Sequence, residues 1–315
     1  MRSRRPAVLT VLALGAALTL GACNDAGEEP TGEPTGQTSE AAPDGGLPTV
    51  EGGYGEEPTI TFPDSQAPAE LKVEVLKEGD GTEVAATDFV VADYHGQVWG
   101  QDQVFDSSFQ HDEPSGFSLD GVIPGWKEGL AGTHVGDRVL LSIPPELGYG
   151  EQAQGESIPP GSTLVFVVDV VERYAPDTNA QADSTPVEPA PDLPVSVEGD
   201  LGAPATITVD DGAPTPTEPE ATVIAEGSGE PVAQGGVLVQ YGITSWDNST
   251  QQSTWESGGV RSVTVGAGTV FDLLADVPVG SRVVIQAPPS QGSGQTPGQP
   301  AVAAVVDVVG TIAAR

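Results

Sequence analysis

The side chains most able to form a functional site are aromatic and branched, and they gather between residues 94 and 166. They comprise Tyr94, Phe105, Val122, Ile123, Trp126, Tyr149, Ile158 and Phe166. Two of the segments that carry them, 104–108 and 146–150, are typical of turns, where a large aromatic side chain needs a reason beyond packing. Asp106 adds a carboxylate to the first of these segments. The set predicts a largely apolar binding site with one acidic group.

Conventional catalytic groups are scarce in this sequence. The three histidines, His95, His111 and His134, have no ligand spacing among them, and Cys23 is the single cysteine. No glycine-rich phosphate loop, nucleophile elbow or zinc motif occurs. We therefore expect neither a metal nor an organic cofactor, and a covalent mechanism has no evident residue to carry it.

Strand patterns dominate the region that holds these residues. Runs rich in branched and aromatic side chains, separated by Gly, Pro and Asp, occur at 71–76, 89–99, 117–119, 138–143 and 163–173. In the last run, two-residue alternation places Leu164, Phe166, Val168 and Val170 on one face. One helix is predicted, at 124–130, with a proline in its first turn and glycines at its end. The pattern predicts an α+β fold, a curved antiparallel sheet with one short helix on one face.

The order of these motifs over residues 70–174 resembles the FKBP family of peptidyl-prolyl cis-trans isomerases, a macrolide-binding family. The most specific element is Val-Ile-Pro-Gly-Trp at 122–126, followed by Glu-Gly-Leu at 128–130. The supporting elements are Phe-Asp-Ser-Ser at 105–108, Val-Gly-Asp at 135–137, Tyr-Gly at 149–150 and Ile-Pro-Pro at 158–160. The resemblance implies a half-barrel wrapped around one short α-helix, a hydrophobic pocket between them, and isomerisation of Xaa-Pro bonds without a cofactor.

The resemblance also implies a role for each candidate residue. Trp126 would form the floor of the pocket, and the backbone NH of Ile123 would bind a substrate carbonyl. Asp106 and the hydroxyl of Tyr149 would supply polar contacts. The implied catalytic set is Tyr94, Phe105, Asp106, Trp126, Tyr149 and Phe166, and the implied substrate-binding set is Val122, Ile123 and Ile158. The expected ligands are proline-containing polypeptides and macrolides.

Several positions depart from the family's pattern. His111 stands where the family often has an arginine near the pocket aspartate, and Ser115 occupies a position that is commonly aromatic. Ser157 stands where a branched residue is common, and the loop at 119–122 is short. We expect these changes to alter substrate preference and macrolide affinity rather than to abolish isomerisation.

The first residues are typical of an exported lipoprotein. Three arginines precede an apolar run at 7–20, and Leu-Gly-Ala-Cys at 20–23 resembles a lipobox, in which the cysteine becomes the lipid-bearing N-terminus. We expect residues 1–22 to be a signal peptide and Cys23 to carry lipid, palmitate included. The protein would then be anchored to the outer face of the cell membrane, outside the cytoplasm. The alternative is an ordinary secretory signal in which Cys23 is incidental.

Composition divides the rest of the chain. Residues 23–57 and 175–194 are rich in Pro and acidic side chains and are predicted to be linkers, which leaves an isomerase domain at 58–174 and a second unit at 195–315. Asp and Glu number 46 against 11 Lys and Arg, giving a formal net charge of −35. This balance argues against nucleic acid as a partner, because phosphate binding requires a basic surface.

The second unit repeats motifs of the first in the same order. VVADYHG at 90–96 returns as VLVQYG at 237–242, and VGDRV at 135–139 returns as VGSRV at 279–283. The ordered spacing predicts a duplicated fold.

The residues of the predicted pocket do not return. Trp255-Glu256 stands in place of Phe105-Asp106, Ala304 stands in place of Phe166, and no tryptophan repeats the one in the helix. The second unit is therefore predicted to fold as a degenerate FKBP-like domain that does not catalyse.

The leading function is prolyl isomerisation on extracytoplasmic proteins, which would help exported chains past slow prolyl steps in folding. The alternative is a non-catalytic proline-binding chaperone or scaffold that uses the same pocket. Retention of Phe105, Asp106, Trp126 and Tyr149 together favours turnover. A solute-binding lipoprotein of a transporter fits poorly, because it would show long α/β units and domain-bridging helices.

Overall fold

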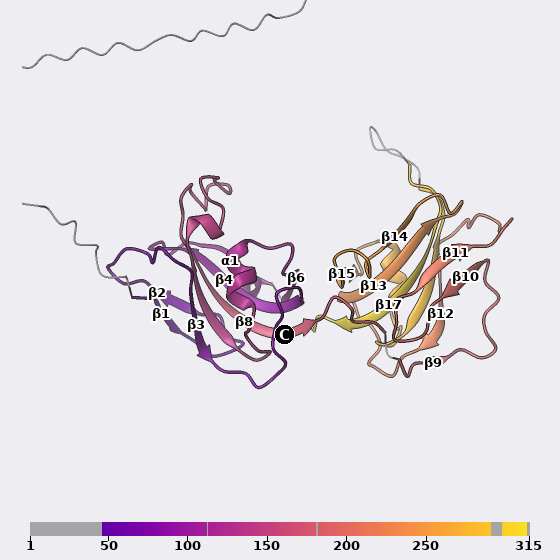
Figure 1. Ribbon diagram of the computed structural model, residues 1–315, viewed down its shortest axis with the longest axis horizontal. Helices are drawn as coiled ribbons and strands as arrows, with labels where there is room; N and C mark the ends of the chain where they lie inside the picture. The colour runs from indigo at the N-terminus through magenta and orange to yellow at the C-terminus, as the bar shows by residue number, and fades with distance from the viewer. Residues whose placement is uncertain (1–45, 112, 181, 291–297, 314–315) are drawn as a thin grey trace, which may run out of the picture. The chain divides into compact units, whose positions relative to one another are not determined.

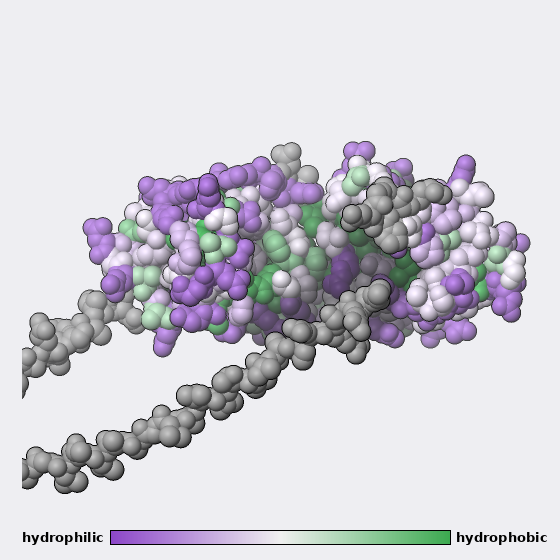
Figure 2. Space-filling view, turned by 90° about the horizontal axis from the view of Figure 1, so that it is seen from above, coloured by the Kyte–Doolittle hydropathy of each residue, from purple (hydrophilic) through white to green (hydrophobic). Residues whose placement is uncertain are grey.

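The computed structural model describes residues 46–111, 113–180, 182–290 and 298–313. The predicted signal peptide at 1–22, Cys23 and the predicted linker up to residue 45 lie outside the described residues. No helix within the described ranges is long and apolar enough to cross a membrane. On the face shown in Figure 2, hydrophilic residues spread over the surface with apolar areas between them.

The first sheet is antiparallel, with the strand order β3-β7-β8-β4-β5 and with β6 also paired to β4 (Figure 1). Its strands are β3 (Lys72–Lys77), β4 (Phe89–Val98), β5 (Val104–Ser107), β6 (Ser115–Ser118), β7 (Arg138–Ile143) and β8 (Leu164–Tyr174). The helix α1 spans Pro124–Leu130, and short 3-10 turns occupy Ser108–Gln110 (η1) and Pro145–Leu147 (η2). The predicted α+β character and the predicted helix are confirmed, and each predicted strand starts within two residues of an observed one.

One segment that reads as a turn is a strand. Val104–Ser107 pairs with β4, with Asp106 opposite Gly96, and a register shift follows at Gln97. Because the pairing holds residues 104 to 107 in the sheet, the prediction of a turn there is wrong. The strand fixes Phe105 and Asp106 at the edge of the sheet beside β4.

Two glycines bring α1 against β7. A Cβ added at Gly125 would collide with Ile143, and one at Gly129 would lie 2.7 Å from Leu141 Cδ2. The backbone of α1 can therefore pack directly against side chains of β7. Trp126 lies between these two glycines in α1. The predicted common face of β8 is confirmed, because its inward residues belong to the same core as Trp126: Leu164, Phe166, Val168 and Val170.

A hairpin, β1 (Thr49–Glu51) and β2 (Thr59–Thr61), packs on the other face of the first sheet. Val50 and Ile60 lie in one apolar cluster with Leu140, Val165 and Val167, which alternate with the residues that face the helix. Residues 46–57 were expected to belong to a linker, and the structure corrects this by placing them in the folded domain.

A buried ion pair ties this hairpin to the sheet. Arg138 Nε donates to Asp169 Oδ1 at 2.6 Å, and its other nitrogens donate to the carbonyls of Gly52 and Glu56, each at 2.6 Å. Tyr54, between these carbonyls in sequence, donates its hydroxyl proton to the Val170 carbonyl at 3.0 Å. The guanidinium thus satisfies carbonyls of the hairpin loop and a carboxylate of the sheet together.

The second sheet has the order β14-β13-β17-β16-β12-β9, with β15 also paired to β13 (Figure 1). Its elements are β9 (Thr185–Pro186), β12 (Glu220–Glu226), β13 (Gly235–Ser245), β14 (Gln251–Ser253), β15 (Arg261–Val265), η3 (Val270–Leu274), β16 (Arg282–Ala287) and β17 (Val302–Thr311). A hairpin of β10 (Val195–Glu198) and β11 (Thr206–Val209) packs against it. Arg282 pairs with Asp307 and donates to hairpin-loop carbonyls, as Arg138 does in the first sheet. Apart from β9 and the 3-10 turn that stands where the first unit has α1, this order repeats that of the first sheet.

The segment predicted as an inter-domain linker is bound to the second sheet. Thr185–Pro186 pairs with β12 as the edge strand β9. Upstream, the side-chain amide of Gln240 donates to the carbonyls of Pro176 and Thr178. Two parts of 175–194 are therefore held to the second sheet, one by strand pairing and one by a side-chain amide, which its proline-rich composition conceals.

Candidate functional site

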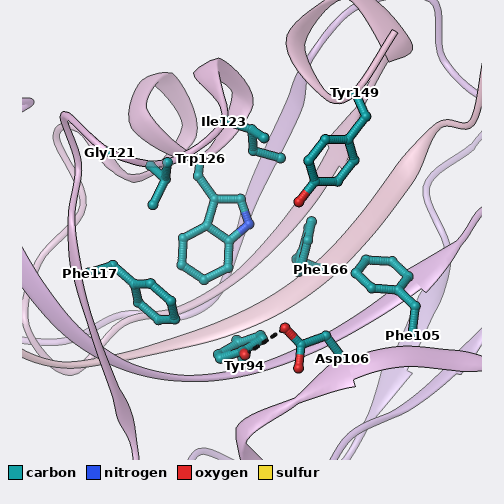
Figure 3. Close-up of a pocket in the computed structure, with 10 residues that line it drawn as sticks. Tyr94, Phe105, Asp106, Phe117, Gly121, Ile123, Trp126, Tyr149 and Phe166 are labelled. Atoms are coloured by element: carbon teal, nitrogen blue, oxygen red, sulfur yellow. Dashed lines mark hydrogen bonds between the residues drawn. The ribbon is translucent and has the colours of Figure 1, made fainter. Parts of the chain in front are cut away.

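A cavity of about 330 Å³ opens between α1 and the first sheet (Figure 3). Its lining consists of Tyr94, Phe105, Asp106, Phe117, Gly121, Val122, Ile123, Trp126, Tyr149 and Phe166. The structure thus brings together eight of the nine residues proposed for the pocket from the sequence, and adds Phe117 and Gly121.

Trp126 is the centre of this lining. Its side chain is only 4% exposed, and its ring meets those of Tyr94, Phe117 and Phe166 edge to face, with centroid distances of 5.5, 5.2 and 5.2 Å. Edge-to-face contacts are favourable because the positive ring edge meets the negative ring face. The indole is therefore held in one orientation at the bottom of the cavity (Figure 3).

Gly96 makes room for two of the aromatic walls. A Cβ at this position would lie 2.7 Å from Phe105 Cζ and 2.8 Å from Phe166 Cε1. These two rings contact each other edge to face at 5.4 Å. Any side chain on residue 96 would displace them, so the wall depends on this glycine of β4.

Asp106 is the carboxylate of the cavity, and it is engaged by a neighbour. The Tyr94 hydroxyl donates to Asp106 Oδ2 at 2.8 Å, drawn as a dashed line in Figure 3. Burial, followed by this hydrogen bond, raises the pKa of the Tyr94 hydroxyl well above its usual value. Tyr94 therefore keeps its proton and orients the carboxylate, which suits Asp106 to electrostatic and hydrogen-bonding roles.

A second hydrogen-bonded chain fixes the strand that carries Tyr94. The Tyr94 backbone NH donates to Ser108 Oγ, and Ser108 donates to Asp93 Oδ1, both at 2.9 Å. These buried bonds join β4 to the residue that follows β5. They hold Phe105 and Asp106 in register with the pocket floor.

The rim of the cavity comes from two loops. Ile123 caps α1 in an extended conformation, and its carbonyl accepts the Trp126 NH at 3.0 Å. Tyr149 follows η2 and is 38% exposed. The ring of Tyr149 faces the cavity in Figure 3, with its hydroxyl toward the interior.

Two residues differ from the sequence-based expectation. Ile158 was expected to bind substrate, but it does not line the cavity: its side chain is 6% exposed and packs in the hydrophobic core. Phe117 was missed, although it shares a strand face with Ser115, the position at which a family aromatic is absent. The alternation of β6 was the signal that could have identified it.

The lining is largely apolar, with a few polar groups. Within the described ranges, no three His, Asp or Glu side chains gather in a way that could ligate a metal ion. The cavity offers aromatic faces, branched side chains, a carboxylate and hydroxyl groups.

Comparison with known proteins identifies the family. Residues 81–171 match the model of the FKBP-type peptidyl-prolyl cis-trans isomerases. A probable FK506-binding protein of Corynebacterium glutamicum is 38% identical over 116 residues, which cover 37% of this chain and 98% of that protein. The chain belongs to the FKBP family.

Other relatives of this FKBP-type chain agree. An FK506-binding protein of Streptomyces anulatus is 40% identical over 119 residues, covering 37% of this chain and 96% of that protein. The FKBP-type 22 kDa peptidyl-prolyl cis-trans isomerase of Escherichia coli is 47% identical over 102 residues, covering 32% of this chain. The aligned segment spans 49% of the E. coli protein, about half its length. The family match contains every residue that lines the cavity.

The second sheet can be aligned with the FKBP domain through strand register. Asp307 faces Arg282 in the sheet as Asp169 faces Arg138. Ala304 precedes Asp307 by three residues, as Phe166 precedes Asp169. Ala304 pairs with Ile243, and Phe166 pairs with Gly96, so Ile243 corresponds to Gly96. The glycine that makes room for the rings is therefore replaced by a branched residue, and the ring of β8 by a methyl group.

The same strand register corrects the residue of the second sheet that corresponds to Asp106. Gln252 pairs with Ile243 as Asp106 pairs with Gly96, so the glutamine, and not Glu256, stands in place of the pocket carboxylate. Thr254 then accepts the Tyr241 NH at 2.9 Å, in the role of Ser108. The prediction that Trp255-Glu256 replaces Phe105-Asp106 is wrong, because those residues follow the threonine instead of preceding it.

Proposed function

We propose that this protein catalyses cis-trans isomerisation of Xaa-Pro peptide bonds in polypeptides, in the cavity of its FKBP domain. The observation that carries the proposal is the cavity itself: about 330 Å³, floored by Trp126, walled by aromatic rings, and holding a carboxylate that Tyr94 orients. Family membership supports the same activity.

The physics of the reaction matches such a lining. Rotation about the peptide C–N bond must cross about 18–20 kcal/mol because it destroys amide resonance. The planar amide is more dipolar than the twisted one, so an apolar, water-poor surface favours the twisted state relative to the ground state. No bond to the protein forms and no proton is removed, so a site of rings and a few hydrogen bonds is sufficient.

The residues divide the work accordingly. Trp126 and Phe166 receive the proline ring, while Phe105 closes the wall beside it. Asp106, oriented by Tyr94, stabilises the charge distribution of the twisting amide. Tyr149 and the Ile123 backbone bind the flanking carbonyl groups.

The place of action follows from the predicted N-terminal features. A lipid on Cys23 would hold the enzyme at the outer face of the cell membrane, where its clients would be exported polypeptides that await prolyl isomerisation. Macrolides would compete for the same cavity, since two relatives are named as FK506-binding proteins.

We infer that the second unit is a duplicated FKBP-like fold without an active site. Matching strand order, matching ion pairs and the two hairpins support the duplication. The exchange of Gly96 and Phe166 for Ile243 and Ala304 supports the loss of the site. Its contribution is then structural or concerns partner binding.

The proposal is tested with the full chain in an NMR exchange assay on Xaa-Pro peptides. The full chain should accelerate exchange, Asp106→Leu should remove most of the acceleration, and Trp126→Ala should abolish it. Absence of acceleration by the unaltered chain would defeat the proposal. Peptide binding without acceleration would establish the scaffold alternative instead, and acceleration that survives both substitutions would show that the reaction does not take place in this cavity.

A further inference from the structure

β3 is an edge strand with an unusual surface. It pairs only with β7 among the described strands, so one side of its backbone has no strand partner in the described part of the chain. The side chains of Val73, Val75 and Leu76 are 44%, 42% and 37% exposed, and they account for three of the four large hydrophobic side chains exposed in the described part of the chain. Edge strands that combine free backbone groups with apolar side chains are templates for strand pairing.

The two lysines of β3 do not shield this edge. Lys77 Nζ donates to the Gly136 carbonyl at 3.0 Å and lies 4.7 Å from the centroid of the Tyr54 ring. Lys72 forms an ion pair with Glu70 at 3.7 Å. Both lysines, the side chains that most often protect an edge, are thus engaged with residues of their own domain, and Glu74 is the other charged residue of the strand.

The second sheet contains the same edge in a covered form. Its strand β12 pairs with β16, and the register shift between Val223 and Ala225 matches the shift between Val75 and Lys77. Position for position, Val223 and Ile224 correspond to Val75 and Leu76. The corresponding residues in β12 are half-buried, whereas those of β3 are exposed.

The cover on β12 is a short extended segment of polypeptide. Thr185 and Pro186 pair antiparallel with Glu226 and Ala225, and the next NH, of Val187, donates to the Ile224 carbonyl at 3.1 Å. The equivalent acceptor in the first sheet is the carbonyl of Leu76. No described segment of the chain pairs with that side of β3.

We propose that the β3 edge binds an extended apolar segment of a non-native polypeptide by strand addition. The bound segment would take the position that β9 takes on β12. Main-chain hydrogen bonds would supply affinity without sequence preference, and contact with Val73 and Val75 would select apolar side chains. This surface is separate from the prolyl cavity and does not depend on its activity.

Such a contact would change how the protein meets its partners. A polypeptide held at β3 keeps its other segments at a high effective concentration near this protein. A weak second binding site on the protein therefore captures those segments more often. Binding at the edge requires no proline in the bound segment.

The test uses the full chain and a fluorescent peptide of alternating Val and Thr that contains no proline, with fluorescence anisotropy as the readout. We expect saturable binding that the double substitution Val73→Lys/Val75→Lys weakens at least about tenfold. Glu74→Lys is the matched control, because it adds the same charge to the same exposed strand while both valines remain. The double variant should isomerise short Xaa-Pro peptides at the rate of the unaltered protein.

A second probe separates strand addition from simple apolar contact. A peptide with the same side chains and N-methylated backbone amides should bind at least about tenfold more weakly, since it cannot donate to the edge. Equal binding of the two peptides, or equal binding to the double lysine variant, would overturn the proposal. Self-association of the unaltered chain in analytical ultracentrifugation, lost in the double variant without any peptide binding, would also overturn it by making the edge an interface between two copies.

Discussion

The two sheets of this chain share their strand order, the register shift in the β3–β7 and β12–β16 pairs and a buried Arg–Asp pair, and they differ on the face that carries the cavity. In the first sheet, Gly96 opposes Phe166. In the second, Ile243 opposes Ala304, so the large side chain stands on the other strand. The residues that hold the fold are therefore distinct from those that form the cavity, and one can change while the other persists.

The largest expected effect is a loss of stability on breaking the buried Arg–Asp pair that each sheet contains. Arg138→Met would leave Asp169 buried without its cation, and a broken buried pair typically costs about 3–5 kcal/mol of unfolding free energy. Arg282→Met should cost a similar amount through Asp307, measured by urea denaturation. Because apolar replacement of both partners removes the buried charge, Arg138→Met/Asp169→Leu should recover most of the loss. A single-variant loss comparable to that of an exposed pair, below about 1 kcal/mol, would contradict the role given to these pairs.

The next largest effect is a loss of activity on exchanging the cavity-wall residues that differ between the two sheets. The double substitution Gly96→Ile/Phe166→Ala gives the first sheet the residues of the second. It should leave the far-ultraviolet circular dichroism unchanged and lower kcat/KM for Xaa-Pro isomerisation at least about 100-fold, equivalent to about 2.7 kcal/mol. Ile243→Ala is the matched control and should leave the rate unchanged. A double variant that retains activity would show that the cavity wall is not the deciding difference.

A smaller effect separates two tyrosines at equivalent positions. Tyr94→Phe removes the hydroxyl that orients Asp106 and should lower kcat/KM about fivefold, the value of roughly one hydrogen bond. Tyr241→Phe should have no effect on the rate. Equal rates for Tyr94→Phe and the unaltered enzyme would remove this hydrogen bond from the mechanism.

The smallest effect is a difference in alkaline stability. Burial, followed by the negative charge of Asp169, raises the pKa of Tyr54 to about 12 from its ordinary value of 10.0. The folded state then holds this proton more tightly than the unfolded state, so the stabilisation is complete below pH 10 and is lost as the pH rises toward 12. Arg138 binds the Gly52 carbonyl as Arg282 binds the Gly199 carbonyl, so Tyr54 corresponds to Leu201 in the second hairpin. The side chain of Leu201 does not titrate.

Tyr54→Phe should therefore reduce the fall in urea midpoint between pH 9 and pH 11 for the first unit. An unaltered pH dependence in this variant would show that Tyr54 does not contribute to the alkaline loss.

Local sequence signals were sufficient where neighbouring residues determine structure. The helix at Pro124–Leu130 follows from its proline and glycines, and the inward face of β8 follows from alternation. Val104–Ser107 could not be recognised as a strand, because its four residues are kept extended by pairing with β4 across a register shift. The β1–β2 hairpin was concealed for a similar reason: its loop depends on an arginine more than 80 residues away in sequence.

The cavity shows the same division. All of its aromatic residues except Phe117 were identified from motif order, since those types are unusual beside turns. Ile158 was misplaced, because sequence order does not show whether a side chain at a loop faces the cavity or the core. Gln252 could be matched to Asp106 only through strand register. In the sequence, the aromatic–acidic pair Trp255-Glu256 resembles Phe105-Asp106 and suggested another alignment.

The docked hairpin also has a consequence for reach. If Cys23 is anchored in a membrane as proposed, the distance at which the FKBP domain can work is limited by the chain between that cysteine and the first docked residues. An extended residue spans at most about 3.3–3.6 Å, so docking of residues 46–57 shortens the available tether by about 40 Å. The hairpin would thereby keep the prolyl cavity in the layer of space nearest the bilayer, where newly exported chains emerge.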